Sequence, residues 1–198
     1  MDLSQLRDVM ASKSYDKIAD VCDELMLRVA STHGVAFQEE WPYAVHLLGH
    51  IYANDLNSAR FLWKSIPAGI KERKQEIMAV WKIGQSLWTR DYAGVYVAIR
   101  GFHWSPEVLD IVMSFSEIYK KRMFQLLLSA YSTISVADTA HFMGMNEEDA
   151  TNYAVHHGWT LDPATHMLTV KKKPIITEQK LDPSKLQRLT EYVFHLEH

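Results

Sequence analysis

The sequence predicts a mainly α-helical protein, in which a helical-repeat domain of the tetratricopeptide or HEAT type precedes a winged-helix unit with a small β-sheet. Apolar residues recur at helical spacing up to about Ala130, and strand-like alternation is absent there. The stretch Tyr131–Val170 then has the order strand, helix, turn, helix and two short strands, and an amphipathic helix pattern follows. We therefore expect helical repeats over 1–130, a winged helix over 131–173, and a linker with a C-terminal helix over 174–198.

The composition is typical of a globular domain of this size. Of 198 residues, 47% are hydrophobic and 23% charged, and the net charge of −3 gives no general attraction to nucleic acid or to anionic membranes. Cys22 is the single cysteine, which excludes an intramolecular disulfide and zinc-ribbon chemistry. The N-terminus MDLSQLRDVM does not have the pattern of a signal peptide, and no apolar run reaches the ~20 residues of a membrane span. We expect a protein of the cytoplasm and nucleus.

A degenerate repeat is visible in the first 130 residues. Three segments begin with a residue that can cap a helix, continue with a large apolar residue, and have a smaller apolar residue three positions later. They begin at Ser14, Asp55 and Asp91, which lie 41 and then 36 residues apart. This spacing is typical of paired-helix repeats and predicts three stacked helical hairpins.

Other helices are predicted from apolar residues that share one face. Ser105-Pro106 suits an N-cap followed by proline at the first helical position, and Asp182-Pro183 has the same form. We expect helices over Phe37–Ala53, Lys71–Trp88, from Glu107, over Tyr119–Ala130, and from Pro183 to about Leu196.

The helices of the winged helix are predicted from their cap and stop residues. Ser135 stands where an N-cap belongs, with Asp138 three residues later in a pair that resembles a capping box. Gly144 ends the first helix, Asn146 can cap the second, and Gly158 ends it. The two helices are expected at Val136–Met143 and Glu147–His157.

Three short strands are predicted around these helices. The sequence Asp162-Pro163-Ala164-Thr165 favours a turn, and therefore a hairpin between the segments that flank it. The strands are expected at Thr133–Ser135, Trp159–Leu161 and His166–Val170.

The charge of the winged helix argues against DNA binding. A winged helix that reads DNA places basic and amide side chains in the major groove and neutralises phosphates with Lys and Arg. Val136–Gly158 contains no Lys or Arg and has four acidic residues, three of them on the first turn of the second helix. Lys171, Lys172 and Lys173 follow the wing and could touch a phosphate backbone, so nucleic-acid binding stays as the alternative of another class. A protein-binding use of the fold is favoured.

The sequence offers one arrangement that could bind a metal. His46 and His50 are four residues apart on a predicted helix, as in zinc enzymes with the H-E-x-x-H motif. Leu47 occupies the place of the catalytic glutamate, and no third ligand lies nearby in the sequence. No nucleophile elbow or glycine-rich phosphate loop is present either. We expect no catalytic residues, no metal and no cofactor.

The order of helical repeats, acidic winged helix, linker and amphipathic helix resembles the PCI-domain family, which supplies subunits to the proteasome lid, the COP-nine signalosome and translation initiation factor three. The motif ISVADTAHFMGMNEEDATNYAVHHGW is similar to the small-subunit branch of that family, and most similar to its signalosome member. The resemblance implies a non-catalytic scaffold subunit of the signalosome, which removes a ubiquitin-like modifier from cullin-RING ubiquitin ligases. The equivalent small subunit of the proteasome lid or of initiation factor three is the alternative.

The resemblance also implies where partners bind, because PCI subunits associate side by side through their winged helices and gather their C-terminal helices into a bundle. The partners are other PCI subunits, and no membrane is involved. The expected contacts of the winged-helix sheet edge are Thr133, Ile134, Ser135, His166, Leu168 and Val170. Those of the C-terminal helix are the members of its apolar stripe, at spacings of three and four: Leu186, Leu189, Tyr192, Val193 and Leu196.

Overall fold

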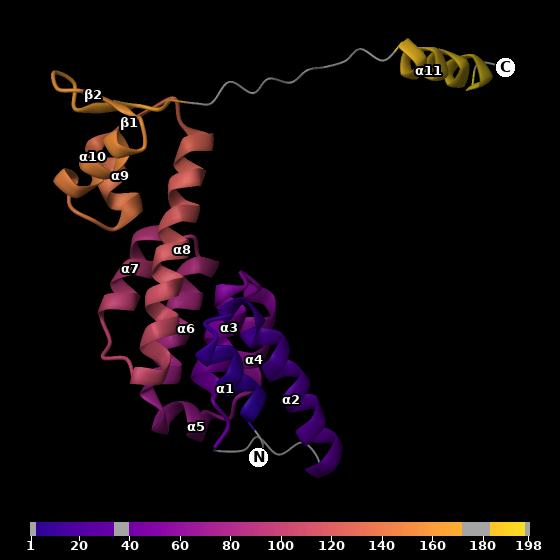
Figure 1. Cartoon of the computed structure of the whole chain (residues 1–198), viewed down its shortest axis with the longest axis vertical. Helices are drawn as coiled ribbons and strands as arrows, with labels where there is room; N and C mark the ends of the chain where they lie inside the picture. The colour runs from indigo at the N-terminus through magenta and orange to yellow at the C-terminus, as the bar shows by residue number, and fades with distance from the viewer. Residues whose placement is uncertain (1–2, 34–39, 172–182, 197–198) are drawn as a thin grey trace.

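The computed structural model describes residues 3–33, 40–171 and 183–196. Its repeat helices lead into a long helix, α8, which extends to the winged helix (Figure 1). Within the described residues, no helix combines the length and the apolar character needed to cross a membrane. The helices before the winged helix are α1 Ser4–Ala11, α2 Ile18–His33, α3 Tyr43–Tyr52, α4 Leu56–Ser65, α5 Ala68–Arg73, α6 Gln75–Trp88, α7 Tyr92–Arg100 and α8 Pro106–Ala130.

The predicted repeat is real at the level of the backbone. Each of its three segments follows a residue in the left-handed conformation, namely Lys13, Asn54 and Arg90. The N–H of the next residue, which is Ser14, Asp55 or Asp91, donates to the carbonyl five positions earlier, at 2.9 to 3.1 Å. This is the Schellman pattern, which satisfies the free carbonyls at a helix end and turns the chain into the next helix.

The predicted caps hold for two of the three repeats. Asp55 accepts a hydrogen bond from the Ser58 N–H at 3.0 Å, and Asp91 accepts one from the Gly94 N–H at 2.9 Å. Ser14 makes no such bond, because the chain first forms a short 3-10 turn, η1 Tyr15–Lys17, before α2 begins. The first repeat therefore enters its helix differently from the other two.

Helix α3 is the centre of the repeat core. Nine of its ten residues are buried, and it packs against α2, α4, α6 and α8. Gly49 makes the contact with α2 possible, since a Cβ atom at this position would lie 2.6 Å from Ile18 Cγ2 and 2.9 Å from the Ala19 nitrogen. The absence of a side chain thus sets how closely the two helices approach.

Three helix boundaries differ from the sequence prediction. Helix α3 begins only at Tyr43, because Pro42 lacks an N–H and restricts the residue before it; Phe37 lies outside the described residues. The helix expected at Lys71–Trp88 is divided at Lys74 into α5 and α6. The two helices expected from Glu107 and at Tyr119–Ala130 are one continuous helix of 25 residues, α8.

The winged helix follows its predicted caps closely. The Asp138 N–H donates to Ser135 Oγ at 3.0 Å at the start of α9 Val136–Met143. Gly144 has the left-handed φ of 62° that ends this helix. The Asp149 N–H donates to Asn146 Oδ1 at 2.7 Å at the start of α10 Glu147–His156. These contacts are local, which is why the sequence was sufficient to predict them.

The three predicted strands form one antiparallel sheet, with bounds that differ slightly for the last two. They are β1 Thr133–Ser135, β2 Thr160–Asp162 and β3 Met167–Thr169, in the order β1-β3-β2. Leu168 pairs with Ile134 on one side and with Leu161 on the other. The turn between β2 and β3 is held by Asp162, whose carboxylate accepts from the Ala164 N–H and the Thr165 hydroxyl.

Candidate partner-binding surfaces

An aromatic cluster attaches the winged helix to α8. Phe124 of α8 stacks on Trp159, with ring centroids 4.9 Å apart, and also contacts Tyr153 and His157 at the end of α10. Trp159 and Phe124 are both buried. Packing of this kind fixes the orientation of the sheet and of α10 on the long helix.

The sheet edge lies elsewhere than the sequence prediction placed it. Leu168 is fully buried on the central strand β3, and Val170 beyond it is buried as well. His166 precedes the strand in a left-handed conformation, and its carbonyl accepts from the Val136 N–H at 3.1 Å. The expectation that His166, Leu168 and Val170 form an outer edge is therefore wrong, because strands on both sides cover β3.

The two edge strands are β1 and β2. In β1, Thr133 is exposed, Ser135 is half-buried and Ile134 is buried under the sheet. All three residues of β2 are exposed, and the β2–β3 hairpin extends away from the helices (Figure 1). The sequence pattern predicted the hairpin but could not say which of its strands is outermost, so β2 was missed as a candidate edge.

The surface of α10 is acidic at its beginning. Glu147, Glu148 and Asp149 form its first turn and are exposed, as is Asp138 on α9. Acidic side chains stabilise the positive end of the helix dipole and repel phosphate groups. This surface therefore favours a protein partner over a nucleic acid.

The C-terminal element is the predicted amphipathic helix, α11 Pro183–Leu196. Its apolar side chains are widely exposed, from 54% for Val193 to 86% for Leu196, with Tyr192 at 60% and Leu189 at 61%. Phe194, which the sequence analysis did not include, is 63% exposed. The side chain of Leu186 lies outside the described residues. An exposed apolar face of this kind makes α11 a candidate surface for protein–protein contact.

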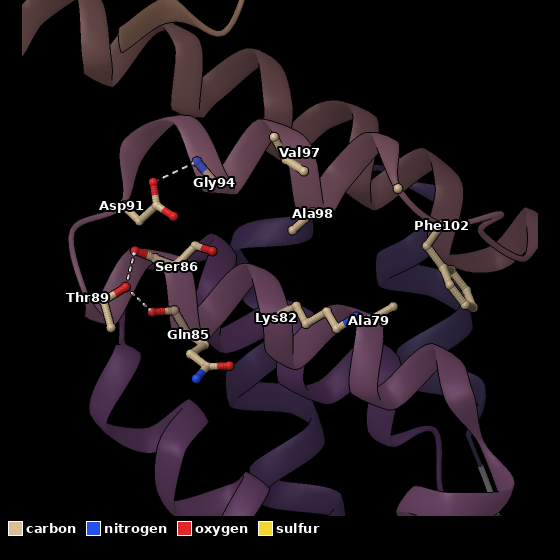
Figure 2. Close-up of a pocket in the computed structure, with 11 residues that line it drawn as sticks. Ala79, Lys82, Gln85, Ser86, Thr89, Asp91, Gly94, Val97, Ala98 and Phe102 are labelled. Atoms are coloured by element: carbon tan, nitrogen blue, oxygen red, sulfur yellow. Dashed lines mark hydrogen bonds between the residues drawn. The ribbon is translucent and has the colours of Figure 1, made fainter. Parts of the chain in front are cut away.

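A groove of about 700 Å³ lies between α6 and α7 (Figure 2). Its polar groups serve the helix ends: Asp91 caps α7 through Gly94, and the Thr89 hydroxyl donates to the carbonyl of Gln85 at 3.0 Å. Its charged side chains are Lys82 on α6 and Asp91, the N-cap residue of α7.

The two histidines of α3 have a partner that the sequence analysis did not find. Asp23 of α2 lies with its Oδ1 atom 2.9 Å from His46 Nε2 and 3.5 Å from His50 Nε2. The two Nε2 atoms are 3.1 Å apart, and the Trp41 indole N–H donates to His46 Nδ1 at 3.3 Å. A carboxylate 23 residues away gives no local signal, so only the packing of α2 on α3 reveals this cluster.

The protonation of His46 and Asp23 follows from their surroundings. Burial lowers the pKa of His46, and the hydrogen bond with His46 lowers the pKa of Asp23. Both directions favour a neutral His46 ring beside an ionised Asp23 carboxylate, and the Trp41 N–H on Nδ1 places the ring proton on Nε2. Burial also raises the pKa of the neighbouring Cys22 thiol to about 12, so this thiol stays protonated at neutral pH and is a core residue.

Comparison with known proteins agrees with the architecture. A sequence model of the CSN8/PSMD8/EIF3K family matches residues 38–179. The COP9 signalosome complex subunit 8 of Arabidopsis thaliana is 63% identical over the full length of both chains. The protein of the same name from Danio rerio is 40% identical over 157 residues, which cover 78% of this chain and 82% of the relative. The one from Dictyostelium discoideum is 26% identical over an alignment of 200 residues, which covers 100% of this chain and 98% of the relative.

Proposed function

This chain belongs to the CSN8/PSMD8/EIF3K family, and from that membership we propose that it is a non-catalytic scaffold subunit of the signalosome. In this role it supports the assembly of the complex that removes a ubiquitin-like modifier from cullin-RING ligases, in the cytoplasm and the nucleus. The names of the full-length relatives favour the signalosome over the proteasome lid and initiation factor three.

The observation that carries the proposal is the exposed apolar face of α11. Burial of each large apolar side chain stabilises a contact by roughly 1.5–3 kcal/mol at most. Leu189, Tyr192, Val193 and Leu196 together therefore offer a substantial gain to partner helices that cover them. A helix of this length is marginal alone in water, so the same partners would also stabilise the helix itself.

The edges of the small sheet supply a second contact. Thr133 and Ser135 of β1 remain candidates from the sequence prediction, and the exposed strand β2 joins them. An edge strand has unpaired backbone N–H and C=O groups, which a neighbouring subunit can pair. The acidic first turn of α10 suits a partner with basic side chains, and it argues against nucleic acid.

Deletion of residues 182–198 tests the role of α11. We expect the shortened chain to fold, to lose incorporation into a reconstituted signalosome, and to leave the remaining complex with reduced cullin deconjugation. Co-purification of the other subunits with the tagged chain measures incorporation, and circular dichroism measures the fold.

Point variants give the matched control. Tyr192→Ala and Leu189→Ala remove apolar contacts, whereas Glu191→Ala changes the polar side of the same helix, where Glu191 accepts from Gln187 at 3.5 Å. The first two should weaken incorporation and the third should not. Full incorporation of the deleted chain, together with a large loss of its stability, would show that α11 serves its own chain and would refute the proposal.

A further inference from the structure

We propose that Asp23, His46 and His50 form a structural site for a divalent transition ion of the zinc class, which fastens α2 to α3. The ligand atoms are Asp23 Oδ1 and the Nε2 atoms of the two histidines, and a water completes the coordination. This inference goes beyond the scaffold function, because nothing in that function requires a metal.

The geometry of the three donor atoms fits such an ion. Zinc binds imidazole nitrogen and carboxylate oxygen at ~2.0–2.2 Å, so two ligands of a tetrahedral ion lie ~3.3–3.5 Å apart. The three atoms are separated by 2.9, 3.1 and 3.5 Å, which form a triangle of nearly this size. Shifts of a few tenths of an ångström in two of the distances would accommodate the ion.

The surroundings combine a rigid frame with access from solvent. His46 and His50 are buried and lie one turn apart on α3, which presents both rings to the same point. Gly49 between them holds α3 tightly against α2, the helix that carries Asp23. The Asp23 side chain is 53% exposed, so an ion and its water ligand can reach the site from that side.

The donor set selects the class of ion. Two imidazoles and one carboxylate suit zinc and its neighbours in the transition series, whereas magnesium and calcium prefer oxygen ligands alone. Leu47 is fully buried where a zinc protease has its catalytic glutamate, so the site lacks a general base at that position. We therefore assign the bound ion a role in stability and no role in catalysis.

Trp41 makes the proposal testable at one atom. Its indole N–H donates to His46 Nδ1, which keeps the proton of the neutral ring on Nε2. An ion on Nε2 moves that proton to Nδ1, where it faces the indole N–H, so binding breaks the Trp41–His46 hydrogen bond. The ring stays neutral, and no proton is released by this shift. The competing explanation of the cluster is a network of hydrogen bonds without a metal, in which Trp41 donates to His46.

The first experiment measures zinc binding by the full-length chain without an affinity tag, after treatment with a chelator. Calorimetry should show one tightly bound zinc ion per chain and no binding of magnesium. The thermal midpoint should rise by about 5–10 °C when free zinc exceeds the dissociation constant a hundredfold.

Variants assign this binding to the cluster. Asp23→Asn keeps an oxygen that can accept from His46 but removes the charge that an ion needs, and His50→Gln removes one ligand. Each should weaken zinc binding at least as much as the ~10–100-fold seen when a supporting partner of a metal ligand is lost. The exposed His103 offers the control, since His103→Gln should bind zinc like the parent.

The second experiment follows the histidine rings by nitrogen-15 NMR. Zinc should move the His46 proton from Nε2 to Nδ1 and shift the Nε2 resonances of His46 and His50. Unchanged ring resonances at excess zinc, or tight binding that persists in folded Asp23→Asn and His50→Gln chains, would overturn the proposal and leave the hydrogen-bonded network as the role of the cluster.

Discussion

Helix α3 is apolar on nearly every side, helix α11 is apolar on one face, and their surroundings are opposite. Nine of the ten residues of α3 are buried by helices of its own chain, whereas the described apolar side chains of α11 are all more than half exposed. An apolar face thus predicts that a helix is covered, but not whether its own chain or a partner covers it. Cover by the same chain stabilises the subunit, whereas cover by a partner supports assembly, which is the role we propose for α11.

The largest expected effect is a cavity in the core of α3. Leu48 is fully buried, and Leu48→Ala removes apolar contacts that the surrounding helices cannot replace. We expect a loss of about 2–5 kcal/mol in the free energy of unfolding, measured by urea denaturation of the isolated chain. A loss below about 1 kcal/mol would contradict the central place of α3 in the core.

A smaller loss is expected where α3 meets α2. In Gly49→Ala the new methyl group would overlap Ile18 and the backbone of Ala19, so the helices must separate. We expect destabilisation of about 1–3 kcal/mol. Gly69→Ala is the control, since its nearest neighbour is the end of the flexible Arg73 side chain at 3.9 Å, and it should leave stability unchanged or raise it.

The cap of α10 tests the winged helix by the same measurement. Asn146→Ala removes the acceptor of the Asp149 N–H and should lower stability by about 0.5–2 kcal/mol. Asn152 lies on the exposed side of the same helix, so Asn152→Ala should change the stability by less than about 0.5 kcal/mol. Equal effects of the two changes would argue against the cap.

The smallest effect on stability is expected in α11. Tyr192→Ala and Leu189→Ala together should change the unfolding free energy of the isolated chain by less than about 0.5 kcal/mol, because both side chains are exposed. A loss comparable to that of Leu48→Ala would remove the contrast between the two helices.

The sequence alone was sufficient for features that residues determine within a few positions. The N-caps Asp55, Asp91, Ser135 and Asn146 are confirmed, as are the left-handed Gly144 and the strand at Thr133–Ser135. In each case one side chain satisfies nearby backbone groups, or a glycine permits the required φ. The broad fold follows from these features and from helical periodicity.

Only the tertiary structure decided which distant segments meet. The order of the strands placed β3 in the centre and buried Leu168, although the alternation of the hairpin is compatible with either strand at the edge. The packing of α2 on α3 brought Asp23 to His46 and His50, although no local pattern connects them. Both results depend on long-range packing, in which the free energy of many buried contacts outweighs local preference, and a single sequence shows that preference far better than it shows the contacts.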